Sequence, residues 1–153
     1  MRSDDRAVSV AVGYVLSLGI ATLLFSVLLI GGSGMIESQT RTVTHDELSV
    51  TGQQLAADLS GADRLVRANV SDGNESKTLR LRTDLPERTA AGSYTIEISH
   101  DDTEGTIELR STSPDVVVRV HFWSQTGVGN STVNGGAVEI SYDGSGPLEV
   151  ESI

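Results

Sequence analysis

The hydrophobic and polar positions along the chain follow three successive patterns. Residues 8–30 form a run of 23 residues without a single charge. Over residues 35–68, apolar side chains recur at intervals of three, four and seven, which is typical of an amphipathic helix. After Asn69, apolar and polar residues alternate, which is typical of half-buried strands. We therefore expect an α+β fold, in which a long N-terminal helix precedes an antiparallel β sheet or a small β sandwich.

The uncharged run has the length and composition of a helix that crosses a membrane. At about 1.5 Å per residue it reaches about 35 Å, and the hydrocarbon layer of a bilayer is about 30 Å thick. A helix also satisfies its own backbone groups in lipid. A buried core helix of this length fits a chain of 153 residues poorly. The apolar part of a cleaved secretory signal is only about 7–15 residues long. The pattern predicts a transmembrane helix over residues 8–30.

Small residues recur at every fourth position of this run. Ser9, Gly13, Ser17 and Ala21 therefore form one stripe along the predicted helix. Stripes of small residues let helix backbones approach closely in apolar surroundings, so we expect a helix-packing face here. The alternative is that glycine and serine are simply frequent in transmembrane helices.

The short head of the chain, residues 1–7, predicts the orientation of the span. It carries Arg2 and Arg6, and no basic residue follows the span until Arg41. Basic residues favour the cytoplasmic side, while acidic residues contribute little. We expect a single-pass protein of the cell membrane, with a cytoplasmic N-terminus and the β region outside.

Residues 31–34, Gly-Gly-Ser-Gly, follow the span directly. Each glycine costs a helix about 1 kcal/mol relative to alanine, so we expect a kink or a loss of helix at this joint. An amphipathic helix is expected over residues 35–68, most strongly over residues 46–68. Residues 40–44 are weak helix formers because they are rich in β-branched side chains.

The region of residues 69–153 is expected to form one outer domain of short strands. Strand-like sequence occupies residues 78–82, 93–99, 106–111, 116–123, 137–142 and 148–151.

The turns between these strands predict antiparallel pairing. Residues 93–99 and 106–111 are expected to form a hairpin around a loop of residues 100–105, and the last hairpin turns at residues 143–146. Residues 116–123 carry the most apolar face and are expected to form a central strand. No helical crossover separates the strands, which excludes a parallel sheet.

Composition narrows the possible functions. The chain has 11 Lys and Arg against 21 Asp and Glu, a net charge of −10, which argues against a nucleic-acid partner. It has no cysteine, which excludes disulfides, thiolate catalysis and cysteine-based zinc sites. The acid-rich, lysine-poor composition resembles that of salt-loving archaea, although an ordinary acidic protein has a similar balance.

Candidate catalytic or metal-ligating residues are few. His45, His100 and His121 lie far apart and have no metal-ligand spacing, and His121 is expected on the solvent face of its strand. The acidic stretch at His100, Asp101, Asp102 and Glu104 has oxygen ligands suited to calcium, but an ordinary acidic turn is the favoured interpretation. No set of nucleophile, base and orienting residue is present. We expect neither an enzyme nor a bound cofactor or metal.

The asparagines and the single tryptophan give two further predictions. Asn69, Asn74 and Asn130 each begin an Asn-X-Ser/Thr sequence in a predicted loop, so they are candidate N-glycosylation sites. Chance matches in a chain rich in serine and threonine are the alternative. Trp123, at the end of its strand, is expected in the core, and an exposed aromatic at the strand end is the alternative.

The sequence Asp-Arg-Ala-Val-Ser-Val-Ala-Val-Gly, residues 5–13, resembles the prepilin-type N-terminus of haloarchaeal type IV pilins. Val10 stands where many of those proteins have proline. The resemblance implies that a prepilin peptidase cuts between Ala7 and Val8. It also implies that the apolar helix stays in the mature protein and packs against other pilin-like subunits.

The expected function is therefore that of a membrane-inserted, pilin-like structural subunit of a type IV pilus-like surface filament or pseudopilus. Its expected partners are the lipid bilayer, a prepilin peptidase and other pilin-like subunits. The alternative is a permanently anchored single-pass surface protein whose β domain binds a ligand or partner.

Overall fold

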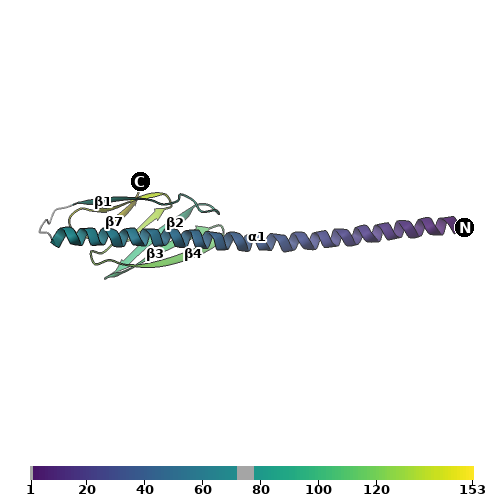
Figure 1. Ribbon diagram of the computed structural model, residues 1–153, viewed down its shortest axis with the longest axis horizontal. Helices are drawn as coiled ribbons and strands as arrows, with labels where there is room; N and C mark the ends of the chain where they lie inside the picture. The colour runs from purple at the N-terminus through teal and green to yellow at the C-terminus, as the bar shows by residue number, and fades with distance from the viewer. Residues whose placement is uncertain (1, 72–77) are drawn as a thin grey trace. The chain divides into compact units, whose positions relative to one another are not determined.

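The structure is a computed structural model that describes the backbone of residues 2–71 and 78–153 (Figure 1). Side chains are described for the same residues except 2–8, 33–34 and 69–71. The chain divides into two compact units, Met1–Gln39 and Thr40–Ile153. One long helix precedes two antiparallel sheets, so the predicted α+β fold is confirmed.

The helix α1, Arg2–Ser71, is a single element of 70 residues. It includes residues 31–34, so the loss of helix expected at this glycine-rich sequence is wrong. Each glycine costs a helix about 1 kcal/mol, but extending an existing helix adds one hydrogen bond per residue without a new nucleus. The weak helix formers of residues 40–44 and the start of the predicted β region, residues 69–71, are helical as well.

Seven strands follow α1. They are β1 Leu79–Asp84, β2 Tyr94–Asp101, β3 Glu104–Thr112, β4 Asp115–Trp123, β5 Ser131–Asn134, β6 Ala137–Tyr142 and β7 Glu149–Ser152. They form a three-stranded sheet in the order β1-β6-β7 and a four-stranded sheet in the order β4-β3-β2-β5, and every pair of neighbouring strands is antiparallel.

The six predicted strands are present, with three differences in detail. The β2–β3 hairpin is tighter than expected, because Asp101 pairs with Glu104 and only Asp102 and Thr103 remain in the turn. Asp102 adopts a φ of 58°, the left-handed backbone conformation that Asp tolerates in tight turns. The strand β5 was not predicted, since its four residues are flanked by glycine and asparagine.

The third difference concerns β4, which was expected at the centre of its sheet and lies at an edge. Val116, Val118 and Phe122 are buried, so the predicted apolar face is correct. Alternation identifies which face of a strand is buried, but it does not identify the strand's lateral neighbours.

The core lies where the second half of α1 meets both sheets. Figure 1 shows this part of the helix running along the strands, with β1 and β7 drawn on one side and β3 and β4 on the other. The fully buried apolar residues of the helix are Leu48, Leu55, Leu59 and Ala62. The fully buried strand residues opposite them include Ile96, Ile107, Leu109, Val138 and Ile140. Thr83 of β1 donates a hydrogen bond to Asp58 Oδ2 of α1 at 2.9 Å, which ties the helix to the smaller sheet.

Gly52 lets α1 approach the larger sheet closely. A Cβ atom at this position would lie 2.7 Å from Leu109 Cδ1 and 2.8 Å from Val120 Cγ2. Both distances are shorter than ordinary van der Waals contact, so any side chain here displaces the Leu109 and Val120 side chains or the helix.

Alanine substitutions at two glycines of α1 are therefore expected to have opposite effects on stability. Gly52→Ala should lower the free energy of unfolding by about 1 kcal/mol, because overpacking exceeds the gain in helix propensity. Gly61→Ala should raise it by up to about 1 kcal/mol, since a Cβ there meets nothing within 4 Å. Urea titration of both variants checks the signs, and a stabilised Gly52→Ala would contradict the close approach.

Candidate functional site

The unit Met1–Gln39 exposes an apolar surface that nothing in its described part covers. The large apolar side chains from Val10 to Ile30 are between 52% and 75% exposed. They lie on all sides of α1, and a helix that is apolar all round needs an apolar environment. The most apolar part of the helix has a mean hydropathy of 2.3, and by length and composition α1 can cross a membrane. This confirms the coarse prediction of a helix compatible with membrane anchoring.

Two hydroxyl groups of this segment, those of Thr22 and Ser26, are satisfied within the helix. Thr22 Oγ1 donates to the Leu18 carbonyl at 2.9 Å, and Ser26 Oγ donates to the Thr22 carbonyl at 2.9 Å. A hydroxyl without a partner is costly in hydrocarbon, and a hydrogen bond to the carbonyl four residues earlier removes that cost. Thr22 and Ser26 are therefore compatible with an apolar surrounding.

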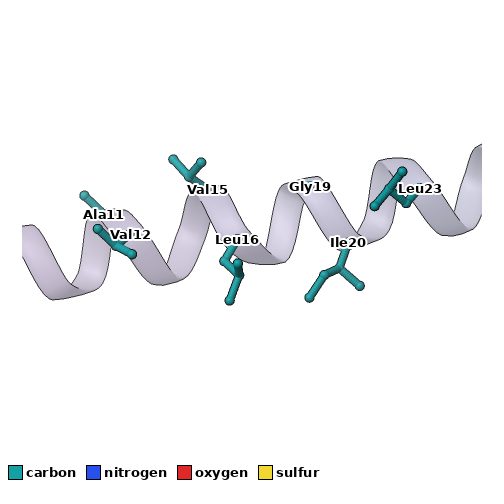
Figure 2. Close-up of a pocket in the computed structure, with 7 residues that line it drawn as sticks. All are labelled: Ala11, Val12, Val15, Leu16, Gly19, Ile20 and Leu23. Carbon is teal, nitrogen blue, oxygen red and sulfur yellow. The ribbon is translucent and has the colours of Figure 1, made fainter.

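Figure 2 shows an open apolar groove on one side of this segment, where Gly19 leaves a gap between larger side chains. Its lining comprises Ala11, Val12, Val15, Leu16, Gly19, Ile20 and Leu23. A Cβ at Gly19 would meet nothing within 4 Å. Gly19 was not part of the predicted stripe.

The predicted stripe lies on a different side of the helix. Ser9, Gly13, Ser17 and Ala21 are all exposed, and a Cβ at Gly13 would meet nothing within 4 Å. Successive helix residues are about 100° apart, which separates the stripe from the groove around Gly19. The helix therefore has two places where another backbone can approach it closely.

The predicted processing site lies in the same helix. The backbone of Ala7 and Val8 belongs to α1, and their side chains lie outside the described residues. The cleavage of this bond stays a prediction.

The three candidate glycosylation sites have different positions. Asn69 lies in α1 and not in a loop, so the predicted loop is wrong there, because the helix extends to Ser71. Asn74 lies outside the described residues. Asn130 is exposed directly before β5, and its Oδ1 accepts a hydrogen bond from the His100 backbone N–H at 2.9 Å. Its amide nitrogen remains available on the surface of a loop.

The histidines do not converge on one site. His45 Nδ1 lies 3.5 Å from Asp46 Oδ1, and His100 Nε2 lies 3.3 Å from the Ser124 carbonyl oxygen. His121 is exposed as predicted, with Nδ1 3.2 Å from Thr106 Oγ1. Within residues 2–71 and 78–153, no group of three or more histidine, aspartate or glutamate side chains is arranged to hold a metal ion.

Trp123 is 66% exposed, so its predicted place in the core is wrong. Phe122 points inward and is only 3% exposed, and the next residue of a strand points to the opposite face. Trp123 is thus a large aromatic side chain on the outer face of the four-stranded sheet, at the end of an edge strand.

Asp63 is a buried carboxylate that links α1 to the loop after β4, and the sequence analysis did not identify it. It is 3% exposed. Its Oδ1 accepts hydrogen bonds from the Gln125 and Thr126 backbone N–H groups at 3.0 and 2.8 Å and from Ser124 Oγ at 3.2 Å. Its Oδ2 accepts one from Arg67 Nε at 3.0 Å. The spacing of Asp63 could have identified it from the sequence. It stands four residues after Leu59 and three before Val66, which places it on the apolar side of the helix.

The charge state of Asp63 follows from these contacts. Burial by itself raises the pKa of the carboxyl, but the hydrogen bonds from Thr126 and Ser124 and the charge of Arg67 outweigh it, so the pKa is lowered. These hydrogen bonds all come from groups of the same chain, so Asp63 anchors α1 to the loop after β4.

Glu108 forms a second charged cluster, on the outer face of the four-stranded sheet. Arg110 Nη2 donates to Glu108 Oε1 at 2.6 Å, and Arg119 Nε donates to Oε2 at 2.8 Å. The hydrogen bond from Arg110 and then that from Arg119 lower the pKa of Glu108. The cluster connects β3 and β4 across this face.

These features define an α+β protein with an exposed apolar N-terminal helix and a separate, packed β unit. The chain belongs to a family of unknown function (DUF7266), whose model matches residues 3–151. No curated protein and no solved structure matches it.

Proposed function

We propose that this chain is a membrane-inserted, pilin-like structural subunit of a type IV pilus-like surface filament or pseudopilus, with a structural rather than a catalytic role. The observation that carries the proposal is the contrast between the two units. Every residue of the hydrophobic core lies in Thr40–Ile153, while the large apolar side chains of residues 10–30 remain exposed. A surface of this kind is stable in lipid or against other apolar helices.

In the mechanism that we propose, the apolar helix exchanges lipid contacts for contacts with other helices. The helix first lies in the bilayer, and during assembly it leaves lipid and packs against the same helices of other subunits. Because lipid tails are as apolar as leucine, close packing at small residues and not the hydrophobic effect then drives association. The exposed stripe at Ser9, Gly13, Ser17 and Ala21 and the gap at Gly19 supply such places. The β unit remains on the outside and determines surface properties such as adhesion, with Asn130 as a candidate glycan carrier.

The experiment that tests the proposal is to determine the mature N-terminus of the protein purified from membranes. Processing by a prepilin peptidase should give a chain that begins at Val8, and deletion of the peptidase should leave the leader in place. A mature chain that begins at Met1, or at a residue after Gly34, contradicts the proposal.

Replacing Gly13 and Ser17 together with leucine distinguishes a filament subunit from a permanent single-pass anchor. Both positions are exposed on the helix, so leucine should leave the folded unit and membrane insertion intact. Incorporation into filaments should fall severalfold, because the bulky side chains separate the helix backbones. The matched control is Leu18→Ala with Phe25→Ala, which changes the same segment without adding bulk at positions outside both the stripe and the groove around Gly19. Unchanged co-sedimentation with filaments would refute packing through this stripe.

A further inference from the structure

A cavity of about 260 Å³ lies beside Trp123, where the C-terminal part of α1 meets the end of β4 and the loop after it. Its lining comprises Asp63, Arg67, Thr103, Trp123, Ser124 and Gln125. Cavities for drug-sized ligands have volumes of about 300–1,000 Å³, so this cavity suits a smaller ligand, such as a single substituted ring. At about 1.5 Å per residue, Arg67 lies about 40 Å along α1 from Thr40, so the cavity is remote from the first residue of its unit.

The residues around this cavity differ in chemistry and in exposure. Trp123 is the apolar member of the lining and is 66% exposed. Thr103 and Gln125 are exposed as well. Asp63 and Ser124 are only 3% and 2% exposed, so they lie on the buried side of the cavity. A ligand that enters from solvent therefore meets one flat apolar ring and otherwise groups that form hydrogen bonds.

The polar side of the cavity is held in place by contacts within the chain. Arg67 Nη1 donates to Gln125 Oε1 at 3.1 Å, and Asp63 Oδ1 accepts from the Gln125 backbone N–H at 3.0 Å. The Ser124 backbone N–H donates to the Thr103 carbonyl at 3.1 Å. Because Arg67 occupies the carboxamide oxygen of Gln125, the Nε2 group is left as a donor for a ligand. Groups that are already ordered lose little conformational entropy on binding.

The charges in the cavity cancel, which favours a neutral ligand. Arg67 Nε and Asp63 Oδ2 form an ion pair at 3.0 Å. An anion would have to compete with Asp63 for Arg67, and a cation would have to compete with Arg67 for Asp63. A wholly apolar ligand is also disfavoured, because it would cover the polar groups of Arg67 and Gln125 without giving them new hydrogen bonds.

A sugar ring in its pyranose form meets these conditions. It is neutral, and it carries C–H groups on one face and hydroxyl groups around its edge. The C–H groups have a small positive charge, which suits the negative face of an indole ring. The hydroxyl groups both donate and accept, so they can accept from Gln125 Nε2 and exchange hydrogen bonds with the exposed hydroxyl of Thr103.

We propose that the cavity beside Trp123 binds a neutral sugar ring, which stacks on the indole and forms hydrogen bonds with Gln125 and Thr103. This inference rests on the proposed function, in which the β unit lies on the outside and determines adhesion. It adds the class of ligand, a neutral glycan, and the cavity that binds it.

Trp123 is the only tryptophan of the chain, so its fluorescence reports on this cavity alone. The full-length protein, in a detergent without a sugar headgroup, is titrated with methyl glycosides of neutral hexoses, N-acetylhexosamines and hexuronic acids, and with sorbitol. At least one neutral glycoside should change the emission and saturate in the millimolar range. Sorbitol carries similar hydroxyl groups without a ring, so it should give no saturable change. The hexuronic acid glycosides should bind severalfold more weakly than their neutral counterparts, because Asp63 already pairs with Arg67.

Variants of two exposed residues test the site. Gln125→Ala keeps the tryptophan and the backbone contact to Asp63, and it should weaken binding severalfold. The matched control is Gln53→Ala, an exposed glutamine of α1 outside the cavity, and it should leave binding unchanged. Trp123→Ala removes the fluorescence, so saturation-transfer NMR of the glycoside measures its binding. We expect a loss of about tenfold, which Trp123→Phe should partly restore.

The possible results separate this inference from the proposed function. No saturable response to any neutral glycoside, by fluorescence or by NMR, would overturn the inference, while a mature N-terminus at Val8 would still support the proposed function. Binding that Trp123→Ala and Gln125→Ala leave unchanged, or an equal response to sorbitol, would also overturn it. Saturable sugar binding by a protein whose mature chain begins at Met1 would support the inference and contradict the proposed function.

Discussion

Leu59→Ala is expected to lower the free energy of unfolding of the β-bearing unit by about 2–5 kcal/mol. Leu59 is fully buried in the core that α1 shares with the sheets. Truncation removes its buried methyl groups and leaves a cavity, and the close packing around the helix limits any collapse. A loss of this size is a large part of the stability of a typical domain, which is about 5–15 kcal/mol.

The matched control is Leu65→Ala on the same helix. Leu65 is 50% exposed, so the same chemical change should alter stability by no more than about 0.5 kcal/mol. Urea unfolding of the full chain in detergent, followed by β-sheet circular dichroism, compares the two variants. Equal losses of unfolding free energy in Leu59→Ala and Leu65→Ala would contradict the assignment of Leu59 to the buried face of α1 and Leu65 to its exposed face.

Asp63→Ala is expected to cost about 3 kcal/mol of unfolding free energy, because it removes one buried acceptor that four donors share. The Gln125 and Thr126 N–H groups, Ser124 Oγ and Arg67 Nε all lose a partner. The control is Asp46→Ala, whose side chain is 74% exposed, and it should change stability little. Hydrogen exchange should show faster exchange at the Gln125 and Thr126 amides in Asp63→Ala only.

The same carboxylate predicts how stability depends on pH. The pKa of Asp63 is lowered in the folded state, so its contribution is fully present above the unfolded pKa of about 3.9. It is lost as the pH falls through the folded pKa, because the unfolded state then binds more protons. Asp63→Asn should therefore flatten the decline of unfolding free energy between about pH 5 and pH 2. The pKa of Glu108 is also lowered, so Glu108 contributes to the loss of stability at low pH in both the unmodified protein and Asp63→Asn. An unchanged acid profile would contradict the role of Asp63.

Local periodicity accounts for most of what could be predicted about the fold. Leu55, Leu59, Ala62 and Val66 recur at intervals of three and four, and all of them are buried as the pattern predicts. The apolar residues spaced by seven, Ile36, Val43 and Val50, are exposed, so that part of the pattern does not mark the buried face. The alternation in β2 and β3 likewise matches their burial. Such patterns depend on neighbours a few residues away, so they can be recognised without knowing the rest of the structure.

The predictions that were wrong concern features that depend on residues far apart in the sequence. The helix continues through residues 31–34 because of the long helical segments on both sides, although the glycines disfavour it. The edge position of β4 depends on strand order, which alternation does not contain. Trp123 was expected in the core, but Phe122 points inward, so the next residue of the strand points to the surface.

The sequence by itself determined that the chain has an uncharged helical run of membrane-crossing length, an amphipathic continuation and a region of antiparallel strands. Each of these follows from the order of apolar and polar residues along a short stretch. Only the tertiary structure decided that α1 is one helix, that Asp63 anchors it to the loop after β4, and that Trp123 faces solvent. These depend on contacts between residues far apart in the sequence, and burial and hydrogen bonding at such contacts outweigh local preference.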